Sequence, residues 1–544
     1  MKKSLTICPS LWRQLFVRPL ILLSCTVLVL ELLGSVFQWL FPVLQKYLVD
    51  ALTAKEPQLS LLWLAAVVSV VVLSGCCLNL AAFCRGILSM RFRSGIKEEL
   101  FRHLLALPED FLHSRGAGYF FNRFQLDIGE SANYVSGGIL RTVPEAVKLL
   151  LALCTIGMVN LRCLPVILLF LLLQWAIAVY FRSIQYRLSG CLQECSAEER
   201  QLVQEFISRH RVVKTAAAGT LAQDKLSAKL SEWKKLTRKR LCSENVFRIA
   251  LKVPVYLCLL IVIGTGLNGY FNGDFSLGTL WSLLLLVQMV FAPARQLGSM
   301  VAASGSACSA WSRLLELSRQ PVESNAGKLC VKLSGEIRFD RLSFGYTPES
   351  KILSGLDLTI PEKTVFFLTG NNGSGKSTIL ALLLRLYSGQ SGKITIGDEN
   401  IENYTLSSYR SRIGYLGQHP EFIPGTLREN LVFDREISDE QIFEVFRLLE
   451  CEEWLKTLSL EYQVKENGSN FSGGERLRLA LARELLRDTD ILLCDESAAH
   501  LDKAGRRNFY RLLDRFNGRK TVICVLHDLP DDFQFPAVDL TEIQ

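Results

Sequence analysis

The chain contains few charged residues. Of its 544 residues only 21% are charged and 49% are apolar, and the mean hydropathy is +0.24. This balance excludes a disordered chain, a coiled coil and a collagen-like fibre. The formal net charge is only +8. Because a nucleic-acid-binding protein would concentrate basic residues in a patch, we expect no nucleic-acid partner.

The sequence also lacks the cysteine spacing of a metal site or a redox motif. Its 16 cysteines are scattered along the chain, and no two form a Cys-x-x-Cys pair. Several lie inside apolar runs, among them Cys25, Cys76, Cys154 and Cys258. We therefore expect reduced thiols that pack as small apolar side chains, not a disulfide framework or a zinc site.

Long apolar runs are what the chain has in abundance, nearly all of them before about residue 300. A membrane-spanning helix needs about 20 mostly apolar residues. Five runs meet this requirement clearly, and a sixth is weaker because Arg141, Glu145 and Lys148 interrupt its first half. The predicted spans are about 19–41, 59–84, 136–161, 163–181, 253–271 and 277–294.

Basic residues predict the orientation of these spans. They gather before the first span and after the second, whereas the gaps 42–58, 159–162 and 272–276 hold few. The positive-inside rule then places both termini and the long connections in the cytosol. We expect an integral membrane protein, and the compact chain favours the inner membrane of a bacterium. The second run continues as a helical pattern past Cys84, which predicts helices that extend well into the cytosol.

The sequence pattern changes after a polar connector at residues 316–334. From residue 335 onward, short β-branched and aromatic runs such as TVFFLTG and DILLCDE alternate with helical stretches. This alternation predicts an α/β domain over residues 335–544.

The sharpest motif in that domain is GNNGSGKST. It follows the strand TVFFL and precedes the helical run TILALLLRLY, which is the strand–loop–helix context of a P-loop. In such a loop backbone amides surround phosphate oxygens, Lys376 reaches the β- and γ-phosphates, and the Ser377 hydroxyl binds Mg²⁺. The predicted nucleotide-binding residues of the loop are Gly370, Asn371, Asn372, Gly373, Ser374, Gly375, Lys376, Ser377 and Thr378.

A second motif, ILLCDE, ends an apolar strand in two carboxylates. Asp495 is placed to hold Mg²⁺, and Glu496 is placed to orient or deprotonate an attacking water. Taken alone, an acidic helix start explains the two carboxylates equally well. The P-loop in the same domain favours the catalytic interpretation.

Between these motifs, FSGGERLRLALAREL opens a helix with Ser472, Gly473 and Gly474. A serine hydroxyl and bare backbone amides at a helix start bind phosphate. Ser472 and Glu475 also fit an ordinary capping box, and the two interpretations are compatible. One domain does not need two phosphate sites for one nucleotide. We therefore expect a two-fold dimer in which the P-loop of one copy and the SGG of the other hold each nucleotide.

These motifs together resemble the nucleotide-binding domain of the ABC transporter superfamily, whose signature LSGGQ is here FSGGE. Six spans followed by one such domain resemble a half-transporter of the exporter type, similar to bacterial peptide, lipid and multidrug exporters. Residues 107–127 and 204–220 are similar to the cytosolic loops that carry the coupling helices of such exporters. The implied fold is an all-α polytopic membrane domain of six long helices at 1–315, plus an α/β P-loop ATPase domain of the ABC type.

The resemblance assigns further residues. Tyr346 matches the aromatic that stacks on adenine, although a core tyrosine at a strand end would look the same. Gln418 matches the glutamine that senses Mg²⁺, Asp502 the aspartate that communicates across the dimer, and His527 the histidine that contacts the γ-phosphate. The implied catalytic residues are Glu496, His527, Lys376 and Gln418. The implied Mg²⁺ ligands are Ser377, Gln418 and Asp495, and the signature contributes Ser472, Gly473, Gly474 and Glu475 to the ATP site.

Charged residues within the predicted spans indicate a cargo site. A carboxylate near the bilayer centre costs roughly 2.5–3.5 kcal/mol on insertion scales, so Glu31 needs a cavity or a partner. Arg141, Glu145 and Lys148 follow a helical spacing of i, i+4 and i+7, and with Arg295 they are candidates for lining a central cavity. The alternative is a structural network that holds helices together.

The predicted function is ATP-driven export of an amphiphilic cargo, such as a peptide, a natural product, a lipid or a drug-like molecule. The implied cofactors are ATP and Mg²⁺, and the implied partner is a second copy of the chain, with a heterodimer as the alternative. Two other functions stay open here: a lipid flippase, and an ATP-gated channel or regulator without vectorial transport. The complete set of hydrolytic residues argues against the channel or regulator.

Overall fold

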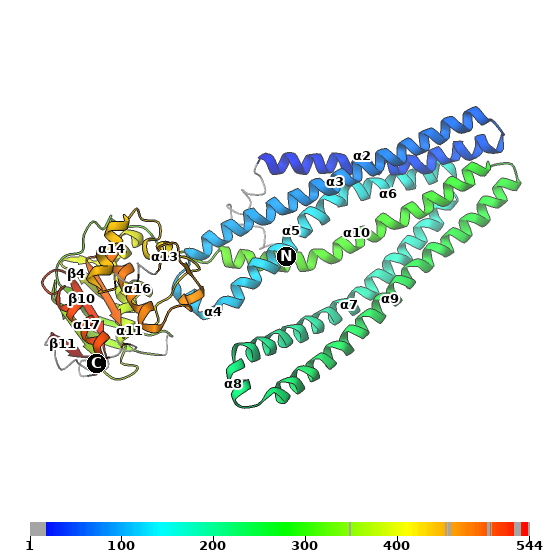
Figure 1. The fold of residues 1–544 in the computed structure, drawn as a ribbon. Helices are drawn as coiled ribbons and strands as arrows, with labels where there is room; N and C mark the ends of the chain where they lie inside the picture. The colour runs from blue at the N-terminus through cyan, green and yellow to red at the C-terminus, as the bar shows by residue number, and fades with distance from the viewer. Residues whose placement is uncertain are drawn as a thin grey trace. The chain divides into compact units, whose positions relative to one another are not determined.

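The computed structural model describes residues 18–347, 350–451, 454, 458–497, 501, 503–526 and 535–541. The chain divides into two compact units. One comprises Met1–Leu104 and Ala117–Gln320, and the other comprises Leu105–Gly116 and Pro321–Gln544. The first is helical, and the second holds the strands (Figure 1).

Among the described residues of the first unit, six helices are long and apolar enough to cross a membrane, as the sequence predicts. Helices suit lipid because they satisfy every backbone hydrogen bond internally. The helical elements are α2 (Arg18–Thr53), α3 (Pro57–Leu105), α4 (Glu109–Asn122), η1 (Arg123–Asp127), α5 (Ile128–Asn133), η2 (Tyr134–Ile139), α6 (Leu140–Val159), α7 (Cys163–Ser208), α8 (His210–Thr215), α9 (Gly219–Phe271) and α10 (Leu277–Ser318).

These helices are much longer than a bilayer requires. The 49 residues of α3 extend about 74 Å at 1.5 Å per residue, against about 30 Å for a hydrocarbon core. The helix continues to Leu105, in agreement with the helical pattern that the sequence shows beyond Cys84. Residues 118–159 also form one long helical run that includes two π-helical segments.

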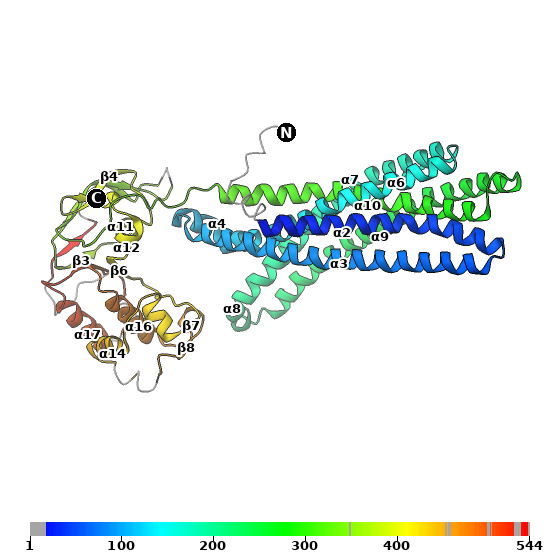
Figure 2. The same ribbon diagram turned by 90° about the horizontal axis from the view of Figure 1, so that it is seen from above.

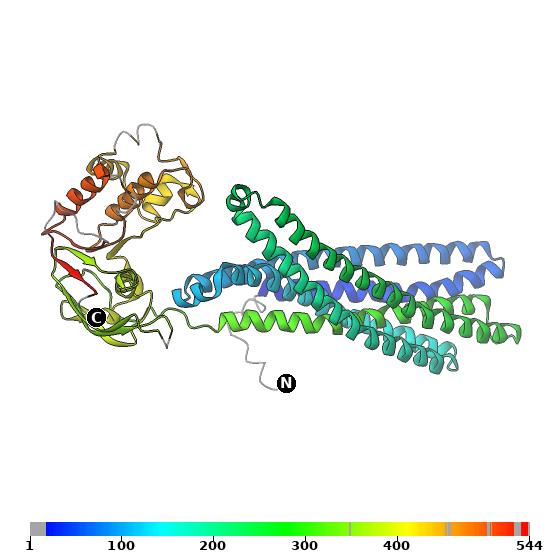
Figure 3. The ribbon, with the colours of Figure 1, turned by 90° about the horizontal axis from the view of Figure 1, so that it is seen from below.

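Helix pairing defines the packing of the first unit. α7 and α9 run side by side as a hairpin, with the short α8 at its tip (Figure 3). α10 packs along both α6 and α2. A buried apolar cluster joins α6, α7, α9 and α10 through side chains such as Ile156, Ile167, Val262 and Leu286.

Two sheets form the centre of the second unit. A parallel sheet has the order β11-β3-β10-β9-β6, and an antiparallel sheet has the order β2-β1-β4-β5. The strands are β1 (Ile337–Phe344), β2 (Leu353–Ile360), β3 (Val365–Thr369), β4 (Ser391–Ile396), β5 (Glu399–Asn400), β6 (Ile413–Leu416), β7 (Gly425–Thr426), β8 (Gln463–Val464), β9 (Ile491–Asp495), β10 (Thr521–Val525) and β11 (Ala537–Asp539).

Helices complete the second unit. They are α11 (Lys376–Leu383), α12 (Leu406–Arg410), α13 (Leu427–Val432), α14 (Asp439–Leu448), α16 (Gly473–Leu486) and α17 (Lys503–Asp514), with two short 3₁₀ turns, η3 (Ile401–Asn403) and η4 (Glu466–Gly468). Figure 2 shows α14, α16 and α17 grouped in one part of the unit and α11 nearer the antiparallel sheet.

The parallel sheet is buried on both faces, because β3, β9 and β10 are fully buried along their length. Alternate side chains enter two different cores: Leu492 and Cys494 pack in one, and Ile491 and Leu493 in the other. Strands covered on both faces become continuous apolar runs, which is why ILLCD and TVICV do not alternate with polar residues. The carboxyl ends of β3, β9 and β6 lie at one edge of this sheet, where the candidate site is built.

Candidate active site

The P-loop is a tight turn between β3 and α11. Gly370 and Gly375 have φ angles of 138° and 83°, a region that side-chain-bearing residues rarely adopt. A Cβ at Gly375 would also lie 2.7 Å from Leu353 Cδ2. The turn therefore depends on these two glycines, which let the backbone curl before α11 begins at Lys376.

Lys376 lies inside this turn. Its side chain is buried, and its Nζ donates hydrogen bonds to the carbonyls of Gly370 at 2.7 Å and Asn371 at 3.0 Å. The ammonium group and the amino end of α11 place positive charge and positive dipole at one point. This arrangement suits a polyphosphate.

The structure brings Ser377 and Asp495 together, although they lie 118 positions apart in the sequence. The Ser377 hydroxyl donates to Asp495 Oδ1 at 3.0 Å. Burial raises the pKa of the Asp495 carboxyl, and the hydrogen bond from Ser377 offsets part of that shift. A hydroxyl and a carboxylate at this separation are oxygen donors that suit Mg²⁺.

Gln418 and Glu496 also meet. The Gln418 side-chain amide donates to Glu496 Oε2 at 2.8 Å. Glu496 has a φ of 46°, which is unusual for a residue with a side chain. Its backbone amide bonds to the Val525 carbonyl at 3.2 Å, so strand β10 holds this conformation in place. Backbone strain of this kind gathers at functional sites.

Tyr346 lies beside the helix that carries the P-loop lysine. Its hydroxyl is 3.3 Å from Thr378 Oγ1, and its ring packs edge-on against Phe344 and Tyr387. The residue is 52% exposed. This exposure disfavours the core-tyrosine alternative and is compatible with stacking on a purine.

Ser472 forms the capping box that the sequence suggests. Its hydroxyl accepts from the Glu475 amide at 3.3 Å, and the Glu475 carboxylate accepts from the Ser472 amide at 2.7 Å. Ser472 and Gly473 remain exposed. Within the described part of the chain, no hydrogen bond connects Ser472, Gly473, Gly474 or Glu475 to the P-loop. Asp502 and His527 lie outside the described residues.

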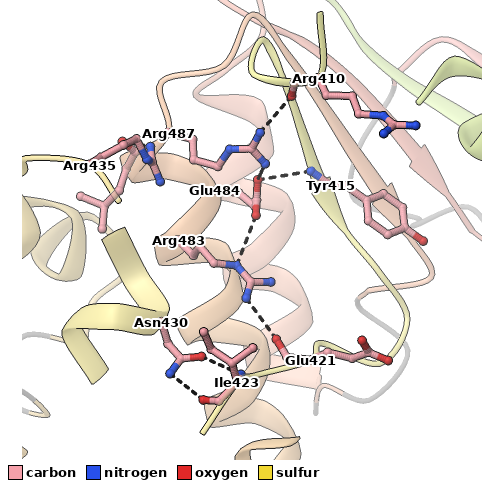
Figure 4. A network of polar contacts seen from close by, with 10 residues as sticks. Arg410, Tyr415, Glu421, Ile423, Asn430, Arg435, Arg483, Glu484 and Arg487 are labelled. Atoms are coloured by element: carbon pink, nitrogen blue, oxygen red, sulfur yellow. Dashed lines mark hydrogen bonds and ion pairs between the residues drawn. The ribbon is translucent and has the colours of Figure 1, made fainter. Parts of the chain in front are cut away.

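Two residues near the site, Tyr415 and Glu484, belong to no recognisable sequence motif. Burial raises the pKa of Tyr415 to about 12, and a hydrogen bond to Asp495 contributes to that shift. The Glu484 carboxylate, buried on α16, accepts a hydrogen bond from the Tyr415 amide (Figure 4). Both residues belong to otherwise ordinary strand and helix patterns. Only their tertiary contacts reveal them.

In the first unit, three of the five candidate cargo residues have partners. Glu31 is buried and forms an ion pair with Arg85. Lys148 contacts Glu145 at 2.8 Å and donates to Gln38 at 3.2 Å. These contacts connect α2 to α3 and α2 to α6, as expected of the structural network that was the alternative interpretation.

Arg141 is placed differently. It lines an open pocket of about 410 Å³ with Tyr134 from η2 and with Gln296 and Met300 from α10. Its Nε is buried without a hydrogen-bond partner among the described residues. Arg295 is exposed and does not line this pocket.

Comparisons with known proteins cover both units. The family model of the ABC transporter transmembrane region matches residues 24–294, and that of the ABC transporter matches residues 353–499. A protein of Nitrosococcus oceani named ATP-dependent lipid A-core flippase is 27% identical over 444 residues, which cover 80% of this chain and 74% of that protein. Proteins of the same name from Shewanella oneidensis and Legionella pneumophila are each 26% identical.

A solved structure shares the fold. It is described as a bacterial Atm1-family ABC exporter with ATP bound, and it matches with a TM-score of 0.81 and 20% identity. The match covers 94% of this chain and 91% of that one. The chain belongs to the ABC transporter family, as an exporter-type half-transporter in which six long apolar helices precede one ATP-binding domain whose ATPase activity drives transport across a membrane.

Proposed function

We propose that this protein works as a dimer that binds ATP with Mg²⁺ and exports a lipid-like amphiphile from the inner leaflet of a bacterial inner membrane, with both termini in the cytosol. The observation that carries the proposal is the pairing of Ser377 with Asp495 and of Gln418 with Glu496 at one sheet edge. Such an edge supplies a cation ligand set and a base beside the phosphate loop.

Each residue then has a distinct role. Lys376 and the P-loop amides hold the β- and γ-phosphates. Ser377 and Asp495 would hold Mg²⁺, which would neutralise charge on the phosphates. Glu496 accepts the proton of the attacking water, and Gln418 orients that carboxylate through their hydrogen bond. Tyr346 stacks on the adenine. His527 and Asp502 keep the roles that the family resemblance implies.

The geometry of the signature supports the proposed dimer. The exposed start of α16 presents the Ser472 hydroxyl and the Gly473 backbone amide, and among the described residues no hydrogen bond joins it to the P-loop of the same chain. In a two-fold dimer, this helix start completes the phosphate site of the second copy.

Two observations support an anionic, lipid-like cargo. The pocket beside Arg141 is open, and it combines this guanidinium with one carboxylate, Glu130, and with apolar and uncharged polar side chains. The Nitrosococcus, Shewanella and Legionella relatives are named for lipid A-core flipping. A buried guanidinium nitrogen without a partner favours a ligand that carries a negative charge.

Reconstitution into vesicles tests the proposal. Full-length protein in proteoliposomes that contain a fluorescent anionic lipid should move that lipid between leaflets only with ATP and Mg²⁺. Glu496→Gln should lower ATPase activity by about 10²-fold or more and stop transport while ATP binding persists. Glu399→Gln, at a half-exposed carboxylate that pairs with Lys328 outside the site, is the control.

The result also separates the alternatives. Equal movement of lipid with and without nucleotide, or a passive ion current, would contradict the proposal in favour of a scramblase or a channel. Near-normal turnover by Glu496→Gln would remove Glu496 from its role.

A further inference from the structure

Glu484 is a buried carboxylate that no motif explains. It lies near the carboxyl end of α16, is 4% exposed, and has an arginine on either side of it along the helix. Arg487 donates to its Oε2 at 2.9 Å, and Arg483 donates to its Oε1 at 3.3 Å. Replacing a whole buried ion pair by apolar side chains is often neutral or stabilising, so stability is a weak explanation for the presence of this charge.

The carboxylate makes a third contact, which leads to the active site. Glu484 Oε2 accepts from the backbone amide of Tyr415 at 3.3 Å. Tyr415 lies on β6, the edge strand of the parallel sheet, so this amide is not used by a further strand. Gln418 follows only three residues later and bonds to Glu496. The contact therefore fixes the strand from which Gln418 is presented.

Arg483 holds the other side of the same segment. It donates to the Glu421 carbonyl at 3.0 Å (Figure 4). It also lies over the ring of Phe422. Just beyond, Asn430 bonds to both backbone groups of Ile423, at 3.0 Å and 2.9 Å. The stretch that carries Gln418 is thus fastened before and after that residue, and two adjacent side chains of α16 make the contacts.

We propose that Arg483 and Glu484 are positioning residues that hold Gln418 against Glu496. The proposal rests on the roles of Gln418 and Glu496 given above. Because the pair lies on the helix whose first residues are the serine and glycines of the signature, a shift of α16 moves both ends of the Gln418 segment. Binding of a phosphate at the start of α16 is thereby connected to the alignment of the base.

Steady-state kinetics of the full-length protein in lipid nanodiscs test this. Glu484→Met removes the acceptor of the Tyr415 amide at similar volume. It should lower kcat about tenfold, because a small displacement of Gln418 misaligns the base. The KM for ATP should stay within about twofold, since the P-loop and Tyr346 are not touched. Glu484→Gln keeps an oxygen acceptor and should recover part of the loss.

A stability control separates positioning from packing. Ile394→Ala truncates the core at strand β4, on the other sheet, and should lower the melting temperature without a selective loss of kcat. If Glu484→Met fails to fold, Arg483→Gln takes its place, because it removes the contact to the Glu421 carbonyl. An unchanged kcat in the variant that folds would overturn the proposal.

A double-mutant cycle with Gln418→Ala gives the decisive result. If Glu484 acts through Gln418, the double variant should be no slower than Gln418→Ala alone. If the losses of kcat in the two single variants multiply in the double variant, Glu484 acts elsewhere and the proposal is overturned. A wild-type kcat in Gln418→Ala would instead contradict the role assigned to Gln418, which distinguishes failure of the proposed function from failure of this inference.

Discussion

At the scale of single residues, two buried carboxylates of this protein have arginine partners. Glu31 in the membrane unit bonds to Arg85, and Glu484 in the ATPase unit bonds to two arginines. Taking a charge out of water is costly unless hydrogen bonds and an opposite charge compensate for it. The stability of each site therefore depends on both members of the pair.

This dependence predicts an asymmetry at Glu31. Arg85→Met leaves a buried carboxylate without its partner and should destabilise the membrane unit by on the order of 3 kcal/mol. The double variant Glu31→Gln with Arg85→Met should recover most of that stability. Thermal unfolding in detergent measures both, with Arg91→Met, at an exposed arginine of the same helix, as the control. An unchanged melting temperature in Arg85→Met would refute a structural role for the pair.

At the scale of elements, three helices in the ATPase unit begin with the same device. α13, α14 and α16 each start with a capping box, built by Thr426, Ser438 and Ser472. A capping box satisfies backbone amides that the helix itself leaves unpaired. Since all three boxes are formed, the box at Ser472 does not by itself indicate function.

The shared device supplies a matched comparison. Ser438→Ala and Ser472→Ala should each lose about 1 kcal/mol of stability, because each removes one cap. Only Ser472→Ala should also lose ATPase activity, since its hydroxyl is proposed to bind phosphate across the dimer. Chemical denaturation and phosphate release measure the two effects. Equal ATPase activity in the two variants would leave Ser472 with capping alone.

At the scale of the whole molecule, the proposed active site is divided between two copies. One chain supplies Lys376 and Glu496, and the other supplies Ser472. This arrangement has a consequence that a site within one chain does not have: two different inactive chains can complement each other.

Mixed dimers test that consequence. Lys376→Ala and Ser472→Ala homodimers should both be inactive. In a mixed dimer both lesions fall in one site and the other site is intact, so random co-assembly should restore about a quarter of the wild-type ATPase activity. Tandem affinity purification of two differently tagged chains isolates the mixed species. No recovery in that species would contradict the shared site.

The sequence alone predicts much of the fold and the main parts of the site. Lys376 could be placed because a strand, a glycine turn and a helix form the P-loop within a dozen residues. The six membrane helices could be placed because length and apolarity suffice to recognise them. The residues of the cargo site were harder to predict. The sequence suggested five, and of these five the structure places only Arg141 in the lining of the open pocket.

Contacts between residues that are far apart in the sequence could be identified only from the tertiary structure, unless a family motif marked both partners. Ser377 and Asp495 carry such motifs, whereas Glu31 with Arg85 and Glu484 with Tyr415 do not. Local conformation, burial and membrane insertion follow from the residue types and spacing of a short segment, so the sequence determines them directly. The register of β6 beside β9 and the depth at which α16 packs depend on the whole core, and they decide which buried charge meets which backbone group.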